Sequence, residues 1–168
     1  NIVVAYVGDA ALETGAFYES LNLAALKKLP ILVILEDNGY STYSNKEVRW
    51  PDAKDVRATI EGMGIIYENG SGDDVEEIYT QVGRITSDVR NNKPILLHLN
   101  TFRRYEHCGP SLDDSMGYRK SDEIESYSAR DPLEILRNKM VISGVISEIL
   151  LERLTKQIND YSEGIFVR

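Results

Sequence analysis

Two short apolar runs rich in β-branched residues constrain the fold of this chain more than any other feature. They cover residues 2–7 and 31–35, and each ends in a polar turn. Uninterrupted apolar runs of this length are typical of strands buried on both faces of a parallel sheet. Between them, residues 13–29 carry apolar side chains at helical spacing until Pro30 ends the pattern. A strand, a helix and a second strand in this order predict an α/β protein.

The rest of the chain repeats this alternation. We expect strands at 65–67 and 94–99, a turn at 70–72, helices at 55–63, 73–89, 131–141 and 147–161, and long loops at 37–51 and 101–120. The predicted fold is a parallel sheet with helices on both faces, formed by residues 1–130, with residues 131–168 as a helical extension packed on the same domain. Because the first apolar run begins at residue 2, we expect an interior part of a longer polypeptide, incomplete at its N-terminus.

Composition excludes several classes of function. The 168 residues carry a net charge of −8, which opposes binding to nucleic acid or to anionic membranes. No apolar run approaches the roughly 18 residues that a membrane span needs. Cys108 is the only cysteine, so no internal disulfide can form and we expect a reducing, cytoplasmic location.

Oxygen-bearing groups follow the first two predicted strands. Asp9 comes after the first strand, and Asn38 and Tyr40 come after the second. Because ligands of parallel sheets bind beyond the carboxyl ends of the strands, we expect these residues to converge. A carboxylate, a carboxamide and the backbone carbonyl of Tyr40 are hard oxygen ligands of the kind that Mg²⁺ prefers.

The turn of Gly8, Asp9, Ala10 and Ala11 is a candidate phosphate site. Its small residues let backbone N–H groups approach an anion at the start of a helix. The alternative is an ordinary strand–turn–helix connection with a capping Asp9. The dinucleotide fingerprint is not met, because Ala10 and Glu13 stand where it requires glycine.

Two histidines are candidates for proton transfer. His107 lies in the loop at 101–120, where it is consistent with either a surface position or a catalytic group. His98 lies within a predicted strand and is expected to be a hydrogen-bonded structural residue. Cys108 follows His107 directly, and adjacent side chains usually point apart, so we assign it no nucleophilic role.

These residues resemble the thiamine diphosphate motif, and the whole chain resembles one family. That family is the alpha subunit of the decarboxylating component of 2-oxo acid dehydrogenase complexes, of the pyruvate, branched-chain and acetoin types. The segments that carry the resemblance are Gly8–Ala11, Gly15, Glu19, Asn22, Ala24–Ala25, Leu29–Pro30, Asp37–Tyr40, Thr101–His107, Asp113–Asp114, Gly117–Arg119 and Asp131–Pro132.

The resemblance implies a thiamine diphosphate-binding fold and a site for the Mg²⁺-bound diphosphate end of that cofactor. Asp9, Asn38 and the Tyr40 carbonyl are the implied Mg²⁺ ligands. The implied cofactor-binding residues are Gly8, Asp9, Ala10, Ala11, Asn38, Tyr40 and His107. His107 is also the implied catalytic residue, for proton transfer or charge stabilisation and for acyl transfer to a lipoyl group.

The resemblance also implies partners. In this family a beta subunit supplies the glutamate that activates the cofactor's aminopyrimidine, in an α2β2 assembly, and a lipoyl-bearing acyltransferase receives the acyl group. The implied activity is oxidative decarboxylation of a 2-oxo acid, an oxidoreductase reaction. The alternatives are a thiamine diphosphate-dependent carbon–carbon ligase and a catalytically silent assembly module with the same fold.

The chain departs from the family pattern at four places. Ala10 replaces a glycine, Asp37 replaces the first of two asparagines, and Tyr105 replaces a second loop histidine. Cys108 stands where many members carry a phosphorylated serine, so regulation by phosphorylation is not expected there. We therefore expect a divergent member of the family.

Overall fold

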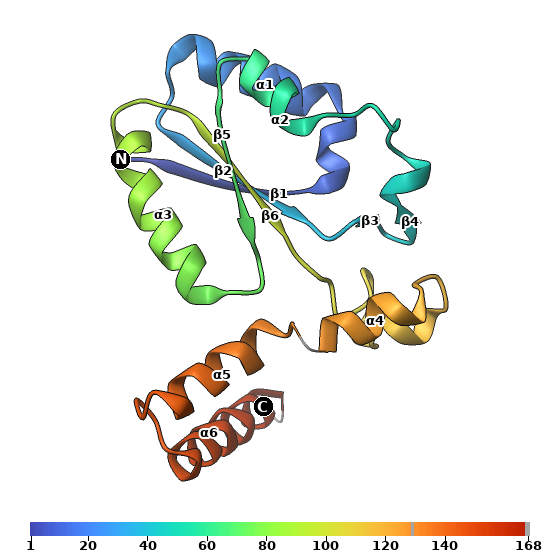
Figure 1. Cartoon of the computed structure of the whole chain (residues 1–168), viewed down its shortest axis with the longest axis vertical. Coiled ribbons are helices and arrows are strands. Elements are labelled where there is room, and N and C mark those ends of the chain that lie inside the picture. The colour runs from blue at the N-terminus through green and yellow to red at the C-terminus, as the bar shows by residue number, and fades with distance from the viewer. Residues whose placement is uncertain (129, 167–168) are drawn as a thin grey trace. The chain divides into compact units, whose positions relative to one another are not determined.

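The first part of the chain contains a four-stranded parallel sheet (Figure 1). The computed structural model describes residues 1–128 and 130–166, and the chain divides into one unit that ends at Arg130 and another that begins at Asp131. In the first unit the strand order is β1-β2-β6-β5. The strands are β1 Val3–Gly8, β2 Ile31–Asp37, β5 Ile66–Ser71 and β6 Ile95–Asn100. The predicted α/β class is confirmed.

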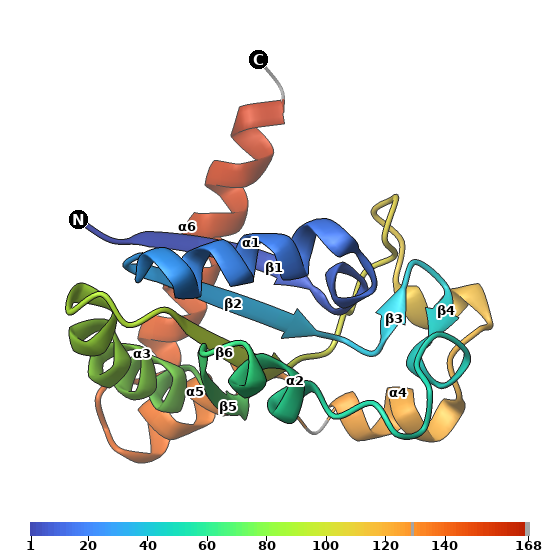
Figure 2. The same cartoon turned by 90° about the horizontal axis from the view of Figure 1, so that it is seen from above.

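Helices cover both faces of this sheet, as predicted (Figures 1 and 2). Helices α1 (Gly15–Lys27) and α2 (Val56–Gly62) pack on one face, where β2 contributes Val33 and Leu35. Helix α3 (Val75–Arg90) packs on the other, against the alternate β2 residues Leu32 and Ile34. The continuous apolar run of β2 is therefore explained by burial on both sides.

The helices begin where the sequence supplies capping side chains. Thr14, Asp55 and Asp74 each accept a backbone N–H bond at the first turn of α1, α2 and α3. A short 3₁₀ turn, η1 (Asp9–Glu13), lies between β1 and α1. It gives the chain one additional turn directly beyond the end of β1.

The expectation that β1 is buried is wrong. The strand forms as predicted, but it lies at an edge of the sheet and pairs only with β2 among the described strands. Val3 is 60% exposed and Tyr6 is 66% exposed. A continuous apolar run gives strand propensity, but the position of a strand in the sheet decides its burial.

Both long loops contain local structure that the sequence did not predict. The first holds a two-stranded hairpin, β3 (Tyr40–Ser41) with β4 (Ser44–Asn45), and then a 3₁₀ turn, η2 (Lys46–Val48). The second holds another 3₁₀ turn, η3 (Asp113–Met116), and leads into helix α4 (Ser121–Ser128).

One predicted turn begins later in the chain than expected. The turn is predicted at 70–72, but β5 continues to Ser71 and the turn begins at Gly72. The strand continues because Gly70 and Ser71 still pair with Leu99 and Asn100 of β6. Pairing with a neighbouring strand outweighs the local turn preference of glycine and serine.

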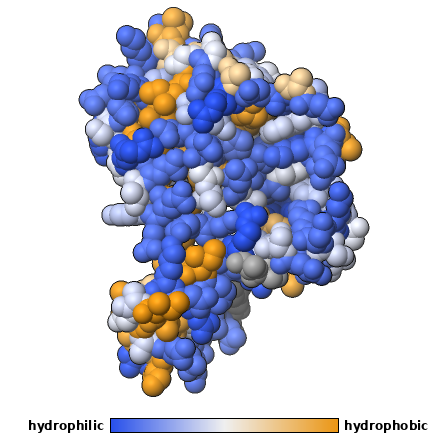
Figure 3. Space-filling model, in the orientation of Figure 1, coloured by the Kyte–Doolittle hydropathy of each residue, from blue (hydrophilic) through white to orange (hydrophobic). Residues whose placement is uncertain are grey.

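The second unit consists of two helices, α5 (Pro132–Ile142) and α6 (Glu148–Phe166). Asp131 caps α5 and Pro132 lies at its first turn, which agrees with the helix predicted at 131–141. Helix α6 runs beyond the predicted end at residue 161. Apolar side chains gather on the visible surface of these helices (Figure 3). The exposed ones include Leu133, Ile142, Ile149, Ile158 and Tyr161.

None of the helices that the structure describes combines the length and apolar content that a membrane span requires.

The core gives a direct test of the fold. Leu96 of β6 is fully buried in the cluster beneath α1 and α2. Leu96→Ala should lower the free energy of unfolding by about 2–5 kcal/mol, because it removes apolar contacts and leaves a cavity. Leu133→Ala, on a side chain that is 71% exposed, should change it by at most about 0.5 kcal/mol. Urea unfolding measures both, and equal effects would contradict this core.

Candidate functional site

The carboxyl ends of β1 and β2 lie level with one another. Gly8 pairs with Glu36, so Asp9 follows β1 at the height where Asp37 ends β2. Asn38 is the next residue, and β3 contacts η1. The structure thus brings the turns that carry Asp9 and Asn38 to one edge of the sheet.

The Asn38 turn has a defined hydrogen-bond pattern. Asn38 Oδ1 accepts the backbone N–H of Tyr40 at 3.0 Å, and Gly39 between them has a φ of 80°, which glycine adopts without strain. The backbone N–H of Lys46 donates to the Gly39 carbonyl at 2.9 Å, so the Tyr40–Asn45 pair of the hairpin is the non-hydrogen-bonded kind. In such a pair the N–H and C=O point out of the ladder. The Tyr40 carbonyl is therefore directed to the side where its N–H meets Asn38.

Asp9 is buried and paired with a residue that sequence reasoning missed. Its side chain is 2% exposed and forms an ion pair with Arg49, which also pairs with Glu13. Trp50 Nε1 donates to Glu13 Oε1 at 2.9 Å. A buried carboxylate needs a positive partner, and the basic residue Arg49 in the loop at 37–51 is the sequence signal for one.

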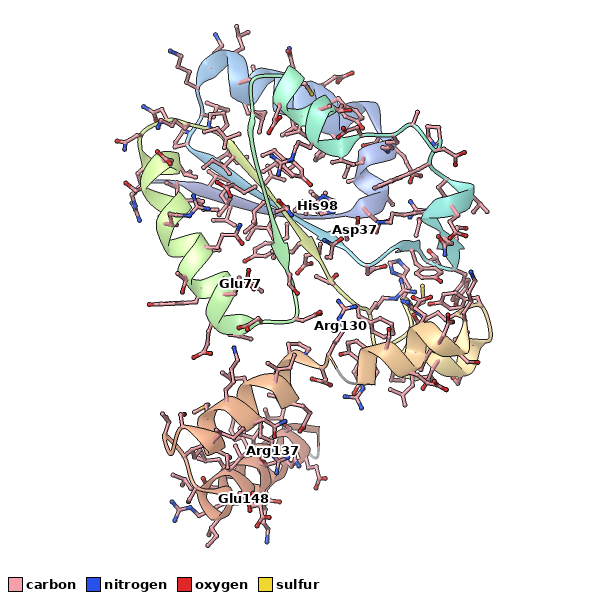
Figure 4. The ribbon with its side chains drawn as sticks, in the orientation of Figure 1. Asp37, Glu77, His98, Arg130, Arg137 and Glu148 are labelled. Carbon is pink, nitrogen blue, oxygen red and sulfur yellow. The ribbon has the colours of Figure 1, made fainter. Side chains whose placement is uncertain are left out.

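Asp37 anchors a second buried network (Figure 4). Its carboxylate accepts hydrogen bonds from Lys46 Nζ at 2.6 Å, His98 Nε2 at 2.9 Å and the Gly39 backbone N–H at 3.0 Å. Burial by itself would raise the pKa of this carboxyl. The hydrogen bonds from His98 and Lys46 more than offset burial and lower the pKa from 3.8 to about 2. Asp37 is therefore ionised at neutral pH.

His98 is a hydrogen-bonded strand residue, as expected. Because the ionised Asp37 only accepts hydrogen bonds, His98 Nε2 must be the donor. In the neutral ring Nδ1 then accepts, and the Tyr67 hydroxyl lies 2.7 Å from it. Its two hydrogen bonds thus hold the His98 ring between Asp37 and Tyr67.

The loop at 101–120 is organised by the buried residue Asp113. Its carboxylate accepts from Arg119 Nε at 2.8 Å, from Arg103 at 3.2 Å and from the Tyr118 hydroxyl. Burial would raise the pKa of Asp113, but the hydrogen bonds from Tyr118 and Arg119 together with the nearby guanidinium charges lower it. The loop is thus folded around one buried carboxylate and the two guanidinium groups that bind it.

The same charged residues fasten the loop and α4 to the β3–β4 hairpin. Glu123 of α4 pairs with Arg119 and accepts the Tyr40 hydroxyl at 2.8 Å. By its sequence, the acidic group of Asp122, Glu123 and Glu125 is typical of a solvated helix face, and for Glu123 that interpretation is wrong. Arg103 donates to the Thr42 carbonyl at 2.6 Å, and the Arg119 guanidinium lies 4.3 Å from the Tyr40 ring centroid. Tyr40 therefore joins the Asn38 turn to the loop that carries His107.

His107 itself lies on the projecting part of this loop. The projection is closed by a bridge between Tyr105 and Leu112 and by a bond of 3.0 Å from the Glu106 N–H to the Ser111 carbonyl. His107 and Cys108 are both exposed there. The structure thus places His107 on a loop attached to the Asn38 hairpin, and none of the described contacts joins it to Asp9 or Asn38.

The arrangement defines an α/β protein with oxygen donors and buried ion pairs gathered at one edge of a parallel sheet. The family model for the dehydrogenase E1 component matches residues 1–164, and the chain belongs to this family. This confirms the resemblance found in the sequence.

Curated relatives are similar over nearly the whole chain. Pyruvate dehydrogenase E1 component subunit alpha of Rickettsia bellii is 32% identical over 161 residues, which are 95% of this chain and 48% of the relative. The subunit of the same name from Rhizobium meliloti is 32% identical over 162 residues, or 95% of this chain and 45% of the relative. The chloroplastic subunit alpha-3 of Arabidopsis thaliana is 28% identical, over 97% of this chain and 37% of the relative. The chain spans about half the length of the first of these relatives.

Solved structures share the fold. Transketolase of Campylobacter jejuni aligns with a TM-score of 0.54 and 25% identity, over 60% of this chain and 15% of the other. Transketolase of Leishmania mexicana also gives 0.54, at 22% identity and the same coverage. These likenesses confirm the predicted fold type.

Replacing Asp113 tests the charged cluster. In Asp113→Asn, the backbone amides at positions 106 and 113, which are hydrogen-bonded within the loop, should exchange hydrogen at least about 100-fold faster at pH 7. The reason is that losing one partner of a buried ion pair costs about 3–5 kcal/mol. Because the pKa of Asp113 is lowered in the folded loop, its negative charge stabilises the folded loop. This stabilisation is present above about pH 4 and is lost as the pH falls and Asp113 becomes protonated. The difference from wild type should therefore shrink at pH 3.

Asp114→Asn is the matched control, because Asp114 is the next residue and is exposed. Hydrogen exchange in the loop should be the same in this variant as in wild type. Equal exchange in all three proteins at pH 7 would contradict the role of Asp113.

Proposed function

We propose that this chain is part of the alpha subunit of a thiamine diphosphate-dependent 2-oxo acid dehydrogenase. Membership of the dehydrogenase E1 component family and relatives named pyruvate dehydrogenase subunit alpha support the proposal. The observation that carries it is the placement of Asp9 and of the Asn38–Tyr40 turn beyond the ends of two paired parallel strands.

The residues at this edge fit a magnesium ion. Asp9 offers a carboxylate, Asn38 a carboxamide oxygen and Tyr40 a backbone carbonyl that points out of its ladder, and all are hard oxygen donors. Among the residues that the structure describes, no group of three His, Cys, Asp or Glu side chains could hold a metal. The proposed ligand set is of a different kind, because it contains one carboxylate together with a carboxamide oxygen and a backbone carbonyl. The ion pair with Arg49 shows that buried Asp9 requires a positive partner, and Mg²⁺ meets the same need.

The turn after β1 fits a diphosphate. Gly8 precedes η1 and provides no side-chain cap, and no heavy atom from beyond its two chain neighbours lies within 4 Å of where a Cβ at Gly8 would be. The first N–H groups of a helical turn have no acceptor within it and suit an anion. Ala10 is not among the residues with positive φ, so its methyl group is compatible with this backbone. We propose that Gly8, Ala10 and Ala11 lie against the diphosphate.

The cofactor, when bound, supplies the carbanion that makes loss of CO₂ from a 2-oxo acid feasible. His107 is the proposed catalytic residue, transferring a proton or stabilising charge at the substrate-derived oxygen and assisting acyl transfer to a lipoyl group. Its loop is fastened to the hairpin of Tyr40 by Arg103 and Glu123, which supports a position near the cofactor.

The proposed partners are a beta subunit in an α2β2 assembly, which supplies the activating glutamate, and a lipoyl-bearing acyltransferase. The name "subunit alpha" in the relatives supports a partner chain. The single Cys108 supports a reducing compartment such as the cytoplasm. The likeness to transketolase favours a carbon–carbon ligase as the second candidate, which forms product with an aldehyde acceptor and without lipoyl.

Calorimetry tests the cofactor site. The full-length protein with its partner subunit should bind thiamine diphosphate only with Mg²⁺ present. Asp9→Asn should weaken that binding by about 100-fold, which is roughly 2.7 kcal/mol, because it removes the anionic ligand. Asp52→Asn, an exposed carboxylate on the same loop as Arg49, is the matched control and should bind as wild type does. The proposal is contradicted if the wild-type protein shows no Mg²⁺-dependent binding of thiamine diphosphate.

Turnover tests His107. His107→Ala should bind thiamine diphosphate with wild-type affinity and lower kcat by about 10²-fold or more, because a positioned proton-transfer group is lost. Cys108→Ala, the exposed neighbour, should keep wild-type kcat. Unchanged kcat in His107→Ala would remove its catalytic role.

A further inference from the structure

The carboxylate of Asp37 connects three separate parts of the chain. It is 1% exposed and stands directly before Asn38. Within the turn, Oδ1 accepts a hydrogen bond from the Gly39 N–H. Oδ2 accepts two more hydrogen bonds, one from Nζ of Lys46, which directly follows the hairpin, and one from Nε2 of His98 on β6. The turn that carries Asn38 is thus fixed at its first residue, at its far end and against the neighbouring strand.

The sheet holds this anchor in place. The Asp37 carbonyl accepts the Thr101 N–H at 2.8 Å, and Asp37 pairs in register with Asn100. His98 lies two residues earlier on β6, and its other ring nitrogen is bound by Tyr67 of β5 at 2.7 Å. Figure 4 shows Asp37 and His98 together at this end of the sheet. A hydrogen-bonded chain therefore crosses β2, β6 and β5 and ends beside the turn.

Donors from two sides engage the Asp37 carboxylate. Lys46, whose side chain is 32% exposed, supplies a charged donor, and His98 Nε2 supplies a second donor from β6. An ionised carboxylate is an acceptor at every oxygen lone pair, and three donors surround this one. A turn held this firmly before binding loses little conformational freedom when a ligand is bound.

We propose that Asp37 and His98 are positioning residues that hold Asn38 and the Tyr40 carbonyl in their metal-binding arrangement. This inference rests on the proposed function of the same site. His98 acts through Asp37, Asp37 acts through the Gly39 N–H, and Lys46 fixes the other end of the turn. The side chains of Asp37 and His98 are both buried, at 1% and 10% exposed.

Two variants of His98 separate the hydrogen bond from the bulk of the ring. The full-length protein with its partner subunit is titrated with MgCl₂ at saturating thiamine diphosphate in a calorimeter. His98→Leu should raise the Kd for Mg²⁺ about 10-fold, because Asp37 loses one donor. His98→Gln should stay within about 3-fold of wild type, because its side-chain N–H can donate to Asp37 in place of Nε2.

Lys46→Met tests the other side of the anchor from a partly exposed position, where the fold is less affected. We expect a rise of about 5- to 10-fold in the Kd for Mg²⁺, because Asp37 loses its charged donor. Glu68→Gln, on strand β5, is the matched control: it weakens the ion pair of Glu68 with Arg84 of α3, at 2.9 Å, and should leave the Kd for Mg²⁺ unchanged. In His98→Leu and Lys46→Met, saturating Mg²⁺ should restore kcat, and KM for the 2-oxo acid should not change.

These outcomes distinguish failure of the positioning role from failure of the proposed function. If wild type shows no Mg²⁺-dependent binding of thiamine diphosphate, the proposed function itself fails. If wild type binds while His98→Leu and Lys46→Met bind as Glu68→Gln does, the positioning role is refuted. It is also refuted if His98→Gln binds as weakly as His98→Leu, or if Tm falls in His98→Leu while the Kd is unchanged.

Discussion

The in-register pairing of β2 with β1 on one side and β6 on the other decides where every candidate residue lies. Gly8, Glu36 and Leu99 are paired in register across these three strands. The three strands therefore end at the same edge of the sheet, and the chain leaves the sheet there after each of them. The exits carry Asp9, the Asn38 turn and the loop of His107. Because parallel strands must all leave at the same edge, the topology by itself brings together residues that are far apart in the sequence.

Buried charge then fixes the conformation of each exit. Asp9, Asp37 and Asp113 are nearly inaccessible to solvent, and each has a basic partner from a loop: Arg49 for Asp9, Lys46 for Asp37, and Arg103 with Arg119 for Asp113. A buried carboxylate without a partner costs several kcal/mol, about 3–5 when one partner of a pair is removed. Such pairs select one loop conformation among many.

Sequence reasoning succeeded where a residue's role depends on its local pattern. The strand runs, the helices at the positions of α1, α2 and α3, and the family could all be predicted, since each depends on neighbours in the chain. It failed for Arg49 and Glu123, which looked like ordinary polar residues. Their roles come from contacts with Asp9 and Tyr40, which lie 40 and 83 positions away. Burial of β1 was also mispredicted, because an apolar run does not reveal which strand lies at an edge.

The sequence by itself determined the order of strands and helices, the oxygen donors placed after the first two strands, and membership of the dehydrogenase E1 component family. These follow from residue type and spacing, which local physics translates directly into secondary structure and turns. Only the tertiary structure decided which charges are buried, which partner each one meets, and that His98 and Lys46 converge on Asp37 beside Asn38. Burial and ion pairing are long-range properties, since they depend on how the chain folds back on itself and not on what stands next in the sequence.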